Sequence, residues 1–179
     1  NLFISLGFSC QSKLLIKKLN LNTLSMPYDW CIVTKNFIKK SLNSNNLNHF
    51  TPDKKLLKLY EMPFEKTQGV FKDGIWFWHD FKRLGNKINP NWKNDTNYIS
   101  KYDYLFKKFL KVTKNNEINK KFIISNAQPN LNEFTKSEKD FKKKFSINKD
   151  FLESVIESLK EKNVKNFEIL TISENKKEY

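Results

Sequence analysis

The stretch that decides the fold is LFISLGFSCQSKLLIKKL, residues 2–19. Its apolar first part is followed by Gly7, then by a hydroxyl residue and leucines at helical spacing. This order predicts a strand, a tight turn and a helix, with Cys10 in the first helical turn. Unpaired N–H groups and the positive end of the helix dipole lower a thiol's pKa there, which favours a nucleophilic thiolate. A small buried cysteine that only packs the helix start is the alternative.

A second motif, MPYDWC at residues 26–31, follows this helix. Pro27 excludes a helix, and we expect the rings of Tyr28 and Trp30 to pack under the first strand. Asp29 is placed to bond the local backbone. We therefore favour a structural cap over a catalytic role for Asp29.

A third motif follows the strongest turn signal in the chain, Asp73-Gly74. Apolar runs on either side of it, at residues 69–71 and 75–78, predict two short strands joined by this turn. The second run continues into His79-Asp80-Phe81. Because its aromatic residues are expected to be buried, His79 would leave the core where the strand ends. A histidine that only hydrogen-bonds in a packed corner is the alternative.

The remaining segments alternate between helix and strand patterns. Residues 54–60 are weakly helical, and residues 98–110 and 152–159 have apolar side chains at helical spacing. Short apolar runs at 122–125 and 167–172 predict buried strands. The alternation predicts an α/β fold with a mostly parallel sheet and helices on both faces, a Rossmann-like three-layer arrangement. It allows one antiparallel edge hairpin, at the Asp73-Gly74 turn.

Polar side chains follow several of the predicted strands. In parallel sheets, ligands bind at the carboxyl ends of the strands. Cys10, His79, Asn126 and Ser173 each come directly after a predicted strand, so we expect them at one edge of the sheet. There an imidazole can take the thiol proton while a third group orients the ring.

The three motifs together, in this order, resemble the family described as putative papain-like cysteine peptidases, known mainly as a domain of unknown function. The segments that carry the resemblance are Ser5-Leu6-Gly7 with Cys10, Pro27-Tyr28-Asp29-Trp30 and His79-Asp80-Phe81. The resemblance covers residues 2–125 and implies that Cys10 is the nucleophile and His79 the base. Gly7 and Ser9 belong to the motif around the nucleophile.

This chain departs from the family pattern at two places. The family usually has Phe where Tyr28 stands, and often Arg after the later strand, where this chain has Ser125-Asn126. The third catalytic member therefore stays open between Asn126, Asp80 and Asp29.

Size and composition indicate one globular domain, residues 1–179, with 39% hydrophobic and 29% charged residues. The chain starts with Asn and ends soon after a strand-like run, which allows a domain that continues beyond either end. No apolar run approaches the ~20 residues that span a bilayer. Two cysteines suit a reducing compartment, so we expect a cytoplasmic location. Two Cys and two His, widely spaced, match no zinc pattern, and we expect neither metal nor cofactor.

The net charge of +14 raises the question of nucleic acid. Arg83 is the only arginine among 33 basic residues, and a bias to Lys, Asn, Ile and Phe is what AT-rich codons produce. Proteins that bind bases or phosphates usually use arginine, because its guanidinium group forms bidentate hydrogen bonds. Polyanion binding through lysine is therefore the weaker alternative.

These observations lead to a predicted cysteine-dependent hydrolase or acyl transferase. Its substrate is left open between a small molecule, a peptide and a glycan-related compound. The main alternative is a non-catalytic or transferase-like domain that binds a phosphate or nucleotide sugar at the Gly7 turn, with Lys13 and Arg83 nearby. Replacing Cys10 by serine would spare that second function and abolish the first.

Overall fold

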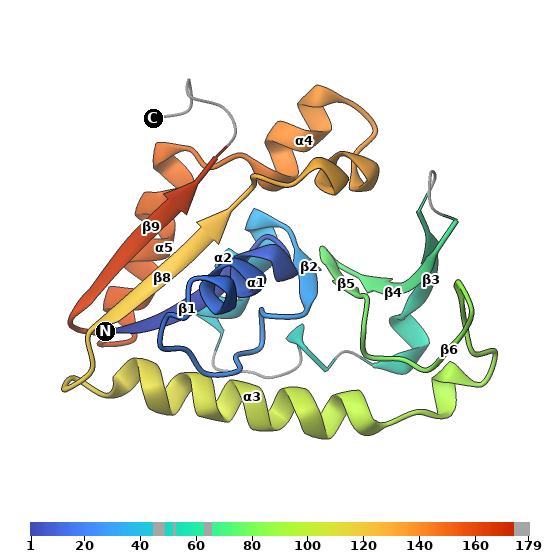
Figure 1. Ribbon diagram of the computed structural model, residues 1–179, viewed down its shortest axis with the longest axis horizontal. Helices are drawn as coiled ribbons and strands as arrows, with labels where there is room; N and C mark the ends of the chain where they lie inside the picture. Colours follow the sequence, from blue (N-terminus) through green and yellow to red (C-terminus); the bar gives the residue numbers. More distant parts are fainter. Residues whose placement is uncertain (45–48, 52, 63–65, 174–179) are drawn as a thin grey trace.

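A three-stranded parallel sheet, in the order β1-β8-β9, contains the first strand of the chain and two strands from its last third (Figure 1). This computed structural model describes residues 1–44, 49–51, 53–62 and 66–173. Leu2, Ile4 and Leu6 of the first strand are buried, as the apolar run predicts. The three strands are β1 (Leu2–Gly7), β8 (Lys120–Ser125) and β9 (Phe167–Ile172).

A four-stranded antiparallel sheet, in the order β2-β5-β4-β3, lies beside the parallel sheet (Figure 1). Its central hairpin turns at Asp73 and Gly74, whose φ angles of 47° and 87° are both positive. The predicted turn is therefore confirmed, because such turns need residues that tolerate the left-handed region. The strands are β2 (Cys31–Val33), β3 (Lys58–Glu61), β4 (Gln68–Lys72) and β5 (Ile75–Phe77). A small hairpin, β6 (Arg83–Leu84) and β7 (Lys87–Ile88), follows them.

Five α-helices lie in the described part of the chain, and four of them begin at side-chain caps. Ser9, Thr34, Ser137 and Asn148 each accept a hydrogen bond from a backbone N–H of the following first turn. The helices are α1 (Cys10–Lys18), α2 (Lys35–Asn43), α3 (Asn97–Lys114), α4 (Glu138–Phe145) and α5 (Lys149–Glu161). None of the helices in the described ranges is long and apolar enough to cross a bilayer.

The α/β class and the parallel arrangement of β1, β8 and β9 are confirmed, but a single, mostly parallel sheet is not what forms. The hairpin strands belong to a separate antiparallel sheet, because a two-residue turn can join only antiparallel strands. The helix predicted at residues 54–60 is also wrong. Lys54–Leu56 form one 3-10 turn, and the next residues form β3, whose backbone groups bond to β4.

One hydrogen bond joins the sheets beside the start of α1: the Val33 N–H donates to the Phe8 carbonyl at 2.8 Å. The Thr34 N–H donates to the Gly74 carbonyl at 2.8 Å, which ties the end of β2 to the turn between β4 and β5. Gly7, with φ +115°, lies so close that an added Cβ would stand 2.7 Å from Cγ2 of Val33. Only glycine suits this position, which fixes the second sheet against the end of β1.

The long helix α3 packs on both sheets and runs along one side of the molecule (Figure 1). On the parallel sheet, the ring of Phe109 lies 6.5 Å from that of Phe122 in β8. On the antiparallel sheet, the ring of Tyr102 lies 5.4 Å from that of Phe77 in β5. Buried aromatic packing of this kind holds the two sheets at a fixed distance, so side chains at their junction are also fixed.

Candidate active site

Cys10 is the first residue of α1, at the predicted strand-turn-helix junction. The hydroxyl of Ser9 caps the helix by accepting a hydrogen bond from the Gln11 N–H at 3.3 Å. The same hydroxyl donates to Oε1 of Gln128, which is 3% exposed. The start of the helix is therefore held from two sides, and the Cys10 side chain is half-buried.

His79 lies two residues beyond β5, where the strand leaves the sheet, as the sequence predicts. His79 is exposed overall, but its ring packs edge-on against the ring of Trp30, with ring centroids 6.1 Å apart and ring planes at 89°. Trp30 belongs to the turn between α1 and β2. Two motifs that are about 50 residues apart in the sequence thus meet at one place.

Cys10 and His79 line the same small cavity, which we call the Cys10 cavity. It lies between the start of α1 and the edge of the antiparallel sheet, and its volume is about 120 Å³. Its lining is mainly apolar, apart from one hydroxyl, one imidazole and the sulfur atoms. The lining residues are Ser9, Cys10, Trp30, Cys31, Ile32, Met62, Trp78 and His79.

Burial decides the protonation of both groups. It raises the pKa of the Cys10 thiol, and a hydrogen bond from the residue's own backbone N–H offsets this only in part. Burial lowers the pKa of His79, with Arg83 adding to the effect and Asp80 opposing it. The lowered pKa predicted for Cys10 from the helix start is therefore wrong, since the cost of desolvating a thiolate is the larger effect. At neutral pH the cavity holds a neutral thiol and a neutral imidazole.

Asp29 has the structural role that the sequence favours. Its Oδ2 accepts a hydrogen bond from the Met26 N–H at 2.9 Å and lies 3.1 Å from Nζ of Lys13. Both side chains are almost fully buried, and burial raises the pKa of Asp29 while Lys13 lowers it in part. The pair ties the turn that carries Trp30 to helix α1.

The carboxylate of Asp80, the residue after His79, contacts helix α3. Its carboxylate is fully buried, forms an ion pair with Lys101 and accepts a hydrogen bond from the Tyr102 hydroxyl at 3.1 Å. Asp80 thus anchors the end of β5 to α3. It acts on His79 through its charge, which favours the imidazolium.

Asn126 follows β8 as predicted but does not line the Cys10 cavity. It is 5% exposed, and its amide Nδ2 donates to the Phe145 carbonyl at 3.2 Å. Of the four polar residues expected at one edge, Cys10 and His79 line the same cavity and Asn126 does not. Ser173 also lies outside the cavity lining.

Gln128 is a site residue that the sequence reasoning missed. It holds the Ser9 hydroxyl, and its own Nε2 is buried without a hydrogen-bond partner in the described part of the chain. The available signal was its place just after the strand that pairs with β1. Trp78 was also missed as a wall of the cavity, because its aromatic character indicated only burial.

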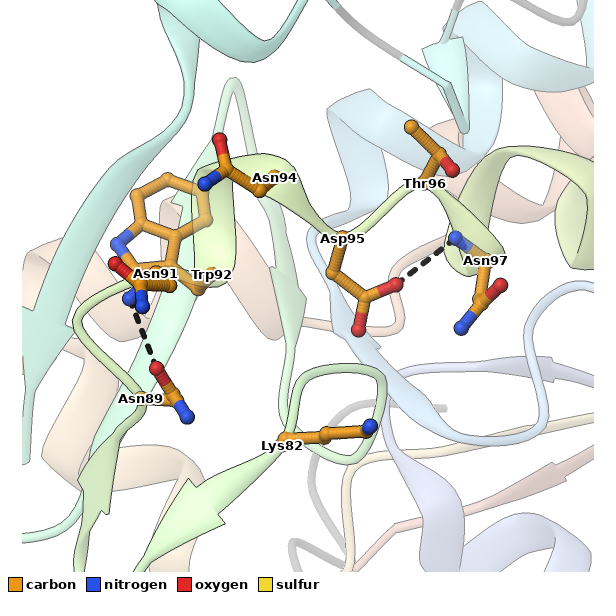
Figure 2. Close-up of a pocket in the computed structure, with 8 residues that line it drawn as sticks. All are labelled: Lys82, Asn89, Asn91, Trp92, Asn94, Asp95, Thr96 and Asn97. Atoms are coloured by element: carbon orange, nitrogen blue, oxygen red, sulfur yellow. Dashed lines mark hydrogen bonds between the residues drawn. The ribbon is translucent and has the colours of Figure 1, made fainter.

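A larger cavity of about 330 Å³ lies between the β6-β7 hairpin and the start of α3 (Figure 2). Its lining contains no cysteine or histidine. Several of its polar side chains bond their own loop: Asn89 accepts from the Asn91 N–H, and Asp95 accepts from the Asn97 N–H, both at 2.9 Å. Its chemistry is therefore that of a surface turn, and the smaller cavity is the candidate active site.

The described residues contain no cluster of three or more His, Cys, Asp or Glu side chains placed to hold a metal ion. A family model described as putative papain-like cysteine peptidase matches residues 1–174 of the chain. No curated protein and no solved structure matches. The resemblance predicted from three motifs is thus confirmed, and it extends past them to include α4, α5 and β9.

Proposed function

We propose that this chain, which belongs to the family described as putative papain-like cysteine peptidases, is a cysteine-dependent hydrolase or acyl transferase. Cys10 is the proposed nucleophile and His79 the proposed general base. One observation carries the proposal: Cys10 begins α1, His79 follows β5, and both side chains line one cavity of about 120 Å³. The rest of that cavity is largely apolar, which strengthens electrostatic interactions with the reacting groups.

In the proposed reaction, Sγ of Cys10 attacks a carbonyl carbon while the His79 imidazole takes the thiol proton. The new C–S bond pushes the carbonyl electron pair onto oxygen. When this oxyanion collapses, the imidazolium gives its proton to the leaving amine or alkoxide, and a thioester remains on Cys10. Water, or another acceptor activated by His79, then releases the acyl group. Positioned proton transfer of this kind contributes about 10²–10⁴ in rate.

The start of α1 supplies the proposed oxyanion site. In this proposal the backbone N–H of Cys10, whose hydrogen bond to the sulfur partly lowers the pKa of the thiol, donates to the oxyanion. One such donor is worth about 3 kcal/mol of transition-state stabilisation. The Ser9 hydroxyl, held by Gln128, keeps this first turn in place.

The neutral resting state makes the proposed mechanism one of general-base catalysis. Burial raises the pKa of Cys10 and lowers that of His79, so the proton stays on sulfur until attack begins. Asp80 favours the imidazolium that forms at that moment, through its charge. Asn126 has no part in the proposed reaction, because it does not line the Cys10 cavity.

The cavity volume favours an acyl-transfer site over a nucleotide-sugar site. Cavities that hold whole small-molecule ligands usually measure about 300–1,000 Å³. The Cys10 cavity, at about 120 Å³, admits only the reacting end of a substrate. A cytoplasmic location, which would keep both free cysteines reduced, is part of the proposal.

The test is acylation by p-nitrophenyl acetate, a substrate with a small acyl group and a good leaving group. We expect a burst of p-nitrophenolate and an acetyl thioester at Cys10, identified by site-resolved mass spectrometry. Replacing Cys10 by alanine should abolish the thioester. His79→Gln should slow its formation about 10²–10⁴-fold, since the neutral thiol then has no base.

The matched control is His49→Gln, because His49 is the other histidine of the chain and lies outside the Cys10 cavity. This variant should acylate at the wild-type rate. Equal acylation rates in the wild type and in His79→Gln would overturn the Cys10–His79 assignment. Acetyl groups found only on lysines would overturn the nucleophile itself.

A further inference from the structure

We infer that the substrate of the Cys10 cavity carries an anionic group, a carboxylate or a phosphate, which Lys17 and Arg83 bind beside the reacting carbonyl. This inference rests on the proposed function and adds a substrate class to it. It is drawn from the two tryptophans that line the cavity and from the cations that lie on them.

The first cation lies on the wall formed by the turn between α1 and β2. Nζ of Lys17 stands 5.2 Å from the ring centroid of Trp30, and Trp30 lines the cavity. Lys17 is in the last turn of the same helix that begins with Cys10. Lys17 is exposed, and its attraction to the ring favours positions of the ammonium group beside Trp30.

The second cation lies on the opposite wall, formed by the end of β5. Cζ of Arg83 stands 5.1 Å from the ring centroid of Trp78, and its Nη2 donates to the Trp78 carbonyl at 2.8 Å. Arg83 is the one arginine in a chain that otherwise uses lysine. A planar guanidinium offers five N–H donors, which allows bidentate binding of a carboxylate or phosphate in addition to the bonds already made.

Neither cation forms an ion pair with a carboxylate within the described residues. The two acidic residues nearest the cavity motifs are both engaged: Asp29 pairs with Lys13, and Asp80 with Lys101. The start of α1 adds a further partial positive charge, with no acidic side chain in its first turn. The two cations on the tryptophans thus have no carboxylate partner within the described residues, and an anionic substrate would supply one.

The test uses Cys10 as a reporter of charge. Iodoacetate and iodoacetamide are of nearly the same size but differ by one negative charge. The measured quantity is the ratio of their alkylation rate constants at Cys10, from site-resolved mass spectrometry at low salt. A change in the thiol's pKa affects both reagents equally and cancels in this ratio.

We expect Lys17→Gln and Arg83→Gln each to lower the iodoacetate-to-iodoacetamide ratio about threefold, the size expected for removing one partly screened unit charge beside the bound reagent. The effect should shrink in 1 M salt, where the Debye length is only about 3 Å. The matched controls are Lys18→Gln, one residue along the same helix, and Lys87→Gln, on the strand that pairs with β6. They remove the same charge without touching either tryptophan ring and should leave the ratio at the wild-type value.

A second arm distinguishes the two anions. Succinate and inorganic phosphate are compared as protectants of Cys10 against neutral iodoacetamide, and the one that protects at the lower concentration identifies the group. Protection by at least one of them is required. A ratio that is the same in the wild type, Lys17→Gln and Arg83→Gln overturns the inference, as does an equal fall in the two control variants.

Failure of the inference is distinguishable from failure of the proposed function. Alkylation needs no general base, so the charge ratio can be measured in His79→Gln as well. An iodoacetate-to-iodoacetamide ratio that falls in Lys17→Gln and Arg83→Gln, without acylation by p-nitrophenyl acetate, would support an anion site and reject the proposed enzymatic function. Acylation with no charge preference would support the enzyme and reject the anion site.

Discussion

Replacing Lys13 by methionine should destabilise the protein strongly, because it leaves the Asp29 carboxylate buried without its cation. The side chains of Lys13 and Asp29 are 2% and 0% exposed, and Oδ1 of Asp29 already lacks a partner among the described residues. Breaking such a pair by removing one partner typically costs about 3–5 kcal/mol. For a domain whose unfolding free energy is about 5–15 kcal/mol, this is a large share.

The loss should depend on pH, with a sign that follows from the pKa of Asp29. Burial raises that pKa in the folded state, and removing Lys13 would raise it further. A carboxyl whose folded pKa is raised favours folding at low pH, and this contribution is lost as pH rises through the folded pKa. The difference between variant and wild type should therefore be largest near pH 8 and smaller near pH 5, by up to about 1.36 kcal/mol per pH unit.

The assay is urea unfolding at these two pH values, followed by far-UV circular dichroism. Lys18→Met, an exposed position in the same helix, is the matched control and should change the free energy of unfolding by less than about 0.5 kcal/mol. Adding Asp29→Asn to the Lys13→Met variant should recover much of the loss at pH 8, since it removes the buried charge. A loss below about 1 kcal/mol, or one that is equal at both pH values, would refute the reasoning.

Three further predictions concern the turn, the buried amide and the base. Gly7→Ala should lower the free energy of unfolding in urea by about 2–6 kcal/mol, because alanine would need a positive φ and its Cβ would be overpacked. Gly85→Ala, where the added Cβ has open space, should lower it by about 1 kcal/mol. Equal losses in the two variants would contradict the steric argument. Asn126→Ala should cost about 1–3 kcal/mol but slow Cys10 acylation less than about tenfold; a larger fall in rate would make Asn126 catalytic. Acylation should be at full rate by pH 7, because the lowered pKa of His79 keeps its ring neutral there; a rate that rises tenfold per pH unit above pH 8 would indicate unassisted thiolate attack.

Part of the candidate site could be predicted because its residues follow local signals. Cys10 begins a helix whose start is predicted by an apolar run, a glycine and a serine, and these residues are close together in the sequence. His79 was found because an Asp-Gly turn fixes where its strand begins and so where it ends. The structural role of Asp29 also follows from its neighbours, since its backbone partner is only three residues away.

Other features depend on residues far apart in the chain. Gln128 bonds Ser9 across 119 residues, and no periodicity connects the two positions. The cations beside the cavity are another case. The sequence placed Lys13 near the Gly7 turn as a ligand for a phosphate, but in the structure its buried ion pair with Asp29 excludes that role. Lys17, one helical turn later, is the lysine that lies over Trp30, a residue that lines the cavity.

The sequence by itself determined the strand-turn-helix at residues 2–18 and the Asp73-Gly74 hairpin, because each depends on backbone preferences of neighbouring residues. Tertiary structure alone decided that β2 and β5 form a second, antiparallel sheet and that Cys10 lines one cavity with His79 and not with Asn126. It also reversed the expected pKa of Cys10, since desolvation depends on what covers the sulfur after folding. Strand pairing and side-chain burial depend on residues that are far apart in the sequence, so a local sequence pattern does not predict them.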